Sequence, residues 1–152
     1  MNSDRVSSYS PIMLSILRIM TGLLFLEHGT QKFLHFPPGK AAGFGWTFSQ
    51  PGAYAGIVEL IAGVLIALGL FTRPAAFLAS GTMAVAYFVG HATKGFWPVN
   101  NMGDAAILYC FVFLYFVFAG PGPIWRWPSS TKPNATAWRR ISSLFPRSER
   151  SR

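Results

Sequence analysis

Residues 53–71 read AYAGIVELIAGVLIALGLF, a run in which Glu59 is the one charged residue. A helix that crosses the hydrocarbon core of a bilayer needs about 20 mainly apolar residues, so this stretch predicts a membrane span. Residues 12–36, 75–92 and 102–119 have a similar character. An ionisable side chain inside such a span is costly and marks a functional site by default, which directs attention to Glu59.

The composition of the whole chain agrees with a membrane protein. Of its 152 residues 51% are hydrophobic and 12% are charged, whereas a soluble domain has about 25% charged residues. The four apolar stretches predict an all-α integral membrane protein built as a four-transmembrane-helix bundle. The predicted parts are an N-terminal segment over residues 1–10, the transmembrane domain over 11–122 and a basic tail over 123–152.

Proline and glycine separate the four stretches. Residues 37–39 (PPG) open the first loop, and residues 72–74 (TRP) are expected to form a tight second loop. Pro98 interrupts the third connection, and residues 120–123 (GPGP) end the last helix.

Positive charge sets the predicted orientation. The net charge is +8, and seven of the thirteen Lys and Arg residues lie in residues 126–152. An even number of spans places both termini on one side, and the side richer in Lys and Arg is normally cytoplasmic. We therefore expect cytoplasmic termini, a tail that contacts anionic lipid and not nucleic acid, and Arg18 reaching the inner interface as an anchor. The stripe that Arg18 shares with Gly22, Phe25 and Gly29 also leaves room for a packing role. The cationic residues expected on the cytoplasmic side are Arg5, Arg18, Arg73 and those of the tail. The opposite side is expected to have only Lys32, Lys40 and Lys94.

This topology brings polar residues from four segments to the outer half of the bundle. Glu59 shares a helical stripe with Gly63, so we expect it to face a neighbouring helix. His28 and Lys32 fall on one face of the first helix, whereas Glu27 points away from Lys32. The sequence predicts a mutually neutralising cluster, because unpaired buried charges are costly. Its members are Glu59, Asp104, His28, Lys32 and His91.

Two interpretations of this cluster stay open. It could hold a small polar or redox-active molecule or transfer protons, since His beside carboxylates suits proton transfer near neutral pH. It could instead only fix the register of the helices. Cys110 is the single cysteine, which excludes a dithiol reaction within the chain. No metal-binding motif is recognised, and the sequence lacks the internal repeat of secondary transporters.

Three segments carry a resemblance to a known family. They are RIMTGLLFLEHGTQKF at 18–33, GIVELIAGVLIALGLFTRPAA at 56–76, and MAVAYFVGHATKGFWPVNNMGDAAILYCFVFLYFVFAGPG at 83–122. In this order they resemble the DoxX family of small four-helix bacterial membrane proteins. After the final GPG the sequence continues PIWRW at 123–127, where relatives often have a Ser-Leu-Asp-like ending. The positions to which the family pattern points are Arg18, His28, Lys32, Glu59, His91 and Asp104.

The resemblance implies a location in the bacterial inner membrane and a link to redox metabolism. Some relatives are associated with thiosulfate:quinone oxidoreduction or with membrane complexes in oxidative-stress defence. We therefore expect a subunit or accessory protein of a membrane redox system, with quinone as the suggested cofactor and another membrane or redox subunit as partner. The alternative is a scaffold without catalytic activity, whose buried charges are structural. Whether the chain is an enzyme stays open.

Overall fold

A computed structural model describes residues 7–38 and 51–124, and every regular element in these two ranges is a helix. The basic tail, most of the first loop and the first six residues lie outside the described ranges, so the prediction of a lipid-binding tail is not addressed. The elements are α2 (Ser10–Leu34), α3 (Pro51–Leu68), α4 (Thr72–Ala86), the π-helix η1 (Tyr87–His91), the 3-10 helix η2 (Ala92–Lys94), α5 (Pro98–Asn101) and α6 (Asp104–Ala119).

The helices fit a membrane in length and composition. Among the described residues three helical stretches are long and apolar enough to cross a bilayer: Ser10–Leu34, Pro51–Leu68 and Thr72–Lys94. The last one runs through α4, η1 and η2 without a break. α6 is equally apolar but has 16 residues, which at 1.5 Å per residue is about 24 Å against a core of about 30 Å. The predicted all-helical, membrane-type fold is confirmed.

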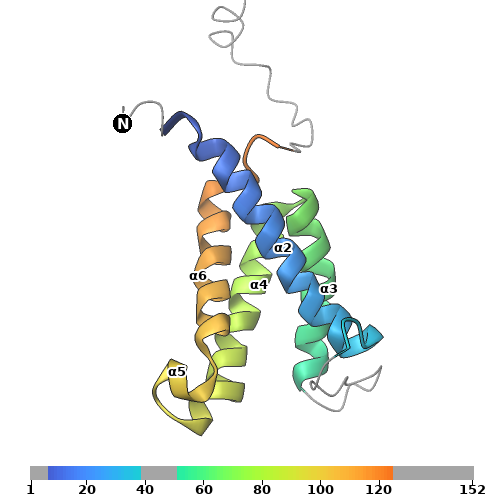
Figure 1. The fold of residues 1–152 in the computed structure, drawn as a ribbon, viewed down its shortest axis with the longest axis vertical. Coiled ribbons are helices and arrows are strands. Elements are labelled where there is room, and N and C mark those ends of the chain that lie inside the picture. Colours follow the sequence, from blue (N-terminus) through green and yellow to red (C-terminus); the bar gives the residue numbers. More distant parts are fainter. Residues whose placement is uncertain (1–6, 39–50, 125–152) are drawn as a thin grey trace, which may run out of the picture.

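The four long helices form two pairs (Figure 1). α2 packs mainly on α3, α4 packs mainly on α6, and contacts between α3 and α4 join the pairs. The start of α2, the α3–α4 turn and the end of α6 lie together at what we call the turn end. The end of α2, the start of α3 and the α4–α6 connection lie at the opposite, loop end, where the pairs diverge.

The core joins the two pairs through aromatic side chains. Phe25 of α2 is fully buried, and its ring lies 4.6 Å from that of Phe113 of α6 in an edge-on arrangement. Fully buried Ile66 of α3 and Ala76 and Ala79 of α4 complete this layer. Small alanines on α4 let its neighbours approach closely, as is usual for helices packed in a membrane.

The turn between α3 and α4 lies earlier in the chain than predicted. Gly69 and Phe71 both have positive φ angles, 77° and 45°, and α4 already begins at Thr72. Pro74 therefore occupies the first helical turn, where its missing N–H is no loss because that group has no partner within the helix. The expected loop at residues 72–74 is wrong, since the proline starts the helix instead of ending one.

Candidate functional site

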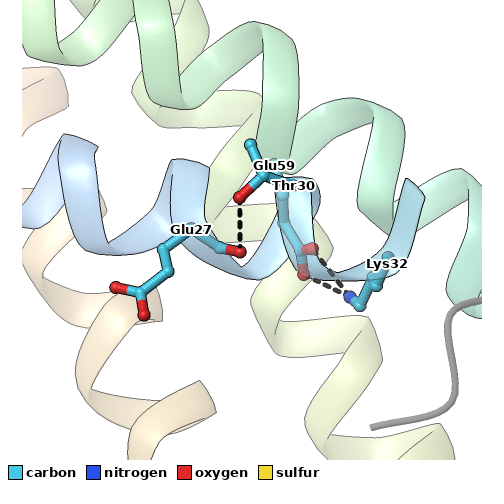
Figure 2. Close-up of polar contacts among 4 residues, drawn as sticks. All are labelled: Glu27, Thr30, Lys32 and Glu59. Carbon is cyan, nitrogen blue, oxygen red and sulfur yellow. Dashed lines mark hydrogen bonds and ion pairs between the residues drawn. The ribbon is translucent and has the colours of Figure 1, made fainter. Parts of the chain in front are cut away.

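An ion pair between Lys32 of α2 and Glu59 of α3 lies towards the loop end of the bundle. Lys32 Nζ donates to both carboxylate oxygens of Glu59, at 2.6 Å to Oε1 and 2.7 Å to Oε2 (Figure 2). The side chain of Glu59 is 4% exposed and that of Lys32 is 22% exposed. Short, charge-assisted contacts to both oxygens are the kind that offsets the cost of burying a carboxylate.

Glycines bring the two helices close enough for this pair. A Cβ atom added to Gly29 would lie 2.8 Å from the backbone nitrogen of Leu60, and one added to Gly56 would lie 2.7 Å from the ring of Phe33. A side chain at either position would force its neighbours to shift, so glycine allows the closest approach of α2 and α3. The predicted packing of Glu59 against a neighbouring helix is confirmed: the residue is 3% exposed.

The ion pair borders a groove of about 870 Å³. Its walls come from α3 and from α4 with η1 and η2, and most of its lining is apolar, including Val58, Phe77 and Val85. Sites for small molecules typically measure about 300–1,000 Å³ and combine an apolar lining with a few polar groups. The charged residues that line the groove are Lys32, Glu59 and Lys94, and His91 and Tyr54 line it as well.

His91 is held at the groove by the connection between α4 and α6. Its Nδ1 atom lies 3.0 Å from the carbonyl oxygen of Asn101, and a carbonyl can only accept, so Nδ1 carries the proton. The Asn101 side chain donates to the Gly95 carbonyl at 2.7 Å and accepts from the Gly103 N–H at 2.8 Å. This arrangement leaves His91 Nε2 as an acceptor whenever the imidazole is neutral.

The other two members of the predicted cluster lie elsewhere. His28 is exposed, and its ring meets that of Tyr109 of α6 edge-on with centroids 5.9 Å apart. Asp104 is exposed in the first turn of α6. Within residues 7–38 and 51–124 the Lys32–Glu59 contact is the single ion pair. The structure thus brings Lys32, Glu59 and His91 to one groove, and it does not bring His28 or Asp104 there.

Arg18 differs most from its expected role. It was predicted to reach the membrane interface, but it is 0% exposed at the turn end of the bundle. Its guanidinium donates to the carbonyl oxygens of Ile66 and Ala67 at the end of α3 and to those of Pro121 and Ile124 beyond α6. The last carbonyls of a helix carry partial negative charge and lack partners. Arg18 satisfies them and is therefore a structural link, so the prediction of an interfacial anchor is wrong.

No larger cluster of metal-binding groups is present in this arrangement. Among the described residues no three side chains of His, Cys, Asp or Glu lie close enough to hold a metal ion.

Comparison with known proteins identifies the family. The sequence model of the DoxX family matches residues 13–92, just over half of the chain. The chain belongs to the DoxX family. The matched range contains Lys32, Glu59 and His91 of the groove as well as Arg18, while Asp104 lies beyond it.

Two relatives extend the comparison. This DoxX protein is 45% identical over 122 residues to an uncharacterized protein of Haemophilus influenzae, covering 78% of this chain and 91% of that protein. It is 29% identical over 127 residues to an uncharacterized membrane protein of Mycobacterium tuberculosis, covering 73% and 75% of the two chains. No solved structure matches the chain significantly. Together with its apolar helices, these likenesses make the chain a membrane protein with several spans.

Proposed function

We propose that this DoxX protein is a subunit or accessory protein of a redox system in the bacterial inner membrane, and that it binds a quinone in the groove between α3 and α4. The observation that carries the proposal is the combination of an 870 Å³ apolar groove with Lys32, Glu59 and His91 among its lining residues. A quinone combines a polar ring with an apolar tail, and a groove of this composition suits both parts.

The polar residues supply complementary hydrogen-bonding groups for such a head group. Lys32 has three N–H donors, of which two point to the Glu59 oxygens, so one remains for a carbonyl oxygen of the ligand. Neutral His91 offers Nε2 as an acceptor for a hydroxyl, because Nδ1–H is directed to the Asn101 carbonyl. The two contacts to the Glu59 oxygens hold Lys32 Nζ in place beside the groove, where it can donate to the ligand.

Binding of a short-chain quinone to the purified protein in lipid nanodiscs, followed by calorimetry, tests the proposal. Saturable binding is expected for the natural protein. Lys32→Met, Glu59→Gln and His91→Phe should each weaken it by about tenfold or more, the equivalent of about 1.4 kcal/mol for a lost polar contact. Phe111→Leu is the matched control, because Phe111 is 65% exposed on α6 and does not line the groove.

The cellular counterpart of this experiment is electron flow to quinone, with thiosulfate as one donor to be tried. If the variants insert normally but lose this flow, the groove is functional. Equal binding by all variants, or no saturable binding at all, would contradict the quinone site.

A scaffold without catalytic activity is the second candidate. It is favoured by the position of the Lys32–Glu59 pair, which connects α2 and α3 where Gly29 and Gly56 already bring them into contact. On this reading the charges only fix the register of two helices. Variants Lys32→Met and Glu59→Gln that lose stability, while the correctly inserted fraction keeps its cellular activity, would support the scaffold.

We further propose four spans with both termini in the cytoplasm. The turn end holds the start of α2 and the end of α6, and it carries Arg18 and Arg73. The sequence before α2 contains Arg5, and the sequence after α6 contains the basic tail, so positive charge gathers on this side. α6 itself covers about 24 Å, and it can cross a core thinner than average if the bilayer thins locally around it. Phosphatase and fluorescent-protein fusions at each terminus test this orientation, and phosphatase activity at either terminus would refute it.

A further inference from the structure

The charged and imidazole groups of the groove between α3 and α4 lie towards its loop end. Glu59 lies ten residues before the α3–α4 turn at residues 69–71, and Gly81 lies ten residues after it, so their backbones reach about the same depth. Helical side chains lean towards the N-terminus of their own helix, which directs the Glu59 carboxylate towards the loop end. His91 lies ten residues beyond Gly81, at the loop end itself. A polar head group would therefore bind on the loop-end side of Gly81.

The deeper part of the groove is apolar. Phe77, Leu78 and Gly81 of α4 line it. Thr82 lines it as well, but its hydroxyl already donates to the Leu78 carbonyl at 2.8 Å, so its proton is not available to a ligand. This stretch suits a hydrocarbon chain and not a second polar group.

The apolar part of the groove is open to the side. Phe77, Leu78 and Val85 line the groove, and yet they are 66%, 61% and 62% exposed. The two walls belong to different helix pairs, which diverge towards the loop end (Figure 1). At this depth the medium around the protein is the hydrocarbon of the bilayer. A ligand dissolved in the lipid can thus enter the groove without crossing water.

Gly81 gives the groove its width. Nothing lies within 4 Å of the position that a Cβ would take at Gly81, so helix packing does not require a glycine there. A long side chain at this position would lean over Phe77 and Leu78, which precede it by four and three residues on the same face. It would then fill the apolar part of the groove. The missing side chain at Gly81 therefore serves the groove and not the fold.

We propose that the groove takes its ligand sideways from the bilayer, with the head group towards the loop end and an apolar tail against Phe77, Leu78 and Gly81. This inference rests on the quinone site proposed above and adds where the tail lies and what admits it. From His91 to Phe77 the chain advances fourteen residues, or about 20 Å, which is more than half of a core of about 30 Å. Because lipid is as apolar as the groove, the tail gains little from burial, and steric fit at Gly81 decides whether it enters.

Two quinones with the same ring, one with a decyl tail and one without a tail, test the role of Gly81 by calorimetry in nanodiscs. Gly81→Leu should weaken binding of the tailed quinone about tenfold or more and leave binding of the tailless one within about twofold. Ala105→Leu is the matched control and should change neither, because Ala105 is exposed on α6 and does not line the groove. If Gly81→Leu weakens both quinones equally, or neither, the proposed tail position is overturned while the quinone site stands.

Photolabelling reads the position of the tail directly. A quinone with a diazirine at the end of its decyl tail should label Phe77 or Leu78, and excess unlabelled decyl quinone should suppress this labelling. Labelling of Tyr54 or Lys94 at the loop end would reverse the orientation, and labelling that excess quinone does not suppress would show that any membrane lipid chain fills the groove. Either result overturns the proposal. A natural protein without saturable quinone binding would instead refute the quinone site itself.

Discussion

Replacing Lys32 by Met should destabilise the protein more than replacing Glu59 by Gln. Both Glu59 oxygens accept from Lys32 Nζ, at 2.6 and 2.7 Å, and Glu59 is only 3% exposed. The carboxylate cannot turn to water when its partner is lost. Removing one partner of a buried ion pair costs about 3–5 kcal/mol, and we expect Lys32→Met to fall in this range.

The opposite substitution has a smaller expected cost. In Glu59→Gln the lysine keeps one acceptor oxygen, and its side chain is 22% exposed and borders the groove. Its flexible stem lets the ammonium group move towards a more polar environment. The loss is then about one hydrogen bond to a charged group, or about 1.5–3 kcal/mol. Combining Lys32→Met with Glu59→Gln in one protein removes both charges together and should cost less than the sum of the two single variants.

Reversible unfolding in mixed micelles with increasing denaturing detergent measures these free energies. The four proteins form a double-mutant cycle, in which we expect an interaction energy of about 2 kcal/mol or more. Additive single effects would refute the coupling read from the structure. Equal destabilisation by Lys32→Met and Glu59→Gln would refute the argument from the unequal burial of the two partners.

Three further predictions use the same unfolding assay. Gly63→Ala should destabilise the protein by about 1–3 kcal/mol through overpacking, because the new Cβ would lie 2.9 Å from the backbone of Leu26. Gly81→Ala is the control and should be neutral or stabilising, because nothing lies within 4 Å of its Cβ position. A larger loss of stability for Gly81→Ala than for Gly63→Ala would contradict the packing of α2 on α3. Arg18→Met should cost about 1–3 kcal/mol, because it removes the charged donor from the carbonyls of Ala67, Pro121 and Ile124. Arg18→Lys should restore only part of this stability, and full restoration would show that the positive charge suffices without the guanidinium geometry. Asn101→Ala should cost about 2 kcal/mol, because it removes the hydrogen bonds of the side chain to the Gly95 carbonyl and from the Gly103 N–H. An unchanged stability would show that these bonds do not hold the connection between α4 and α6 in place.

The spans and the face of Glu59 could be predicted because they depend on local patterns. A continuous apolar run of sufficient length specifies a helix in a membrane, since a helix satisfies its backbone groups within the one segment. Gly63, one turn after Glu59, predicts close packing on the same face. The start of α4 was predicted too late because a proline such as Pro74 can lie in a loop or in the first turn of a helix. Phe71 has a left-handed conformation that ends the turn, so the helix begins at Thr72 and includes Pro74.

The candidate site was only partly predictable, because contacts between helices depend on their relative rotation. Lys32 and Glu59 were among the expected partners, and the structure pairs them. Asp104 was expected beside them from its depth alone, but the turn through Met102, with a φ angle of 60°, leaves it exposed at the start of α6. Arg18 resembled an interfacial anchor because its acceptors are backbone carbonyls, which leave no trace in the sequence.

The burial of Arg18 bears on how the protein is made in the membrane. Its acceptors are separated from it by 48 and 49 residues for the α3 carbonyls, and by 103 and 106 residues for Pro121 and Ile124. When α2 first enters the membrane, none of these partners is yet packed beside it, and a long cationic side chain then reaches towards the lipid headgroups. We expect the guanidinium to find all its acceptors only after α3 has inserted and residues 121–124 have followed. The final position of α2 would thus depend, through Arg18, on segments that follow it in the chain.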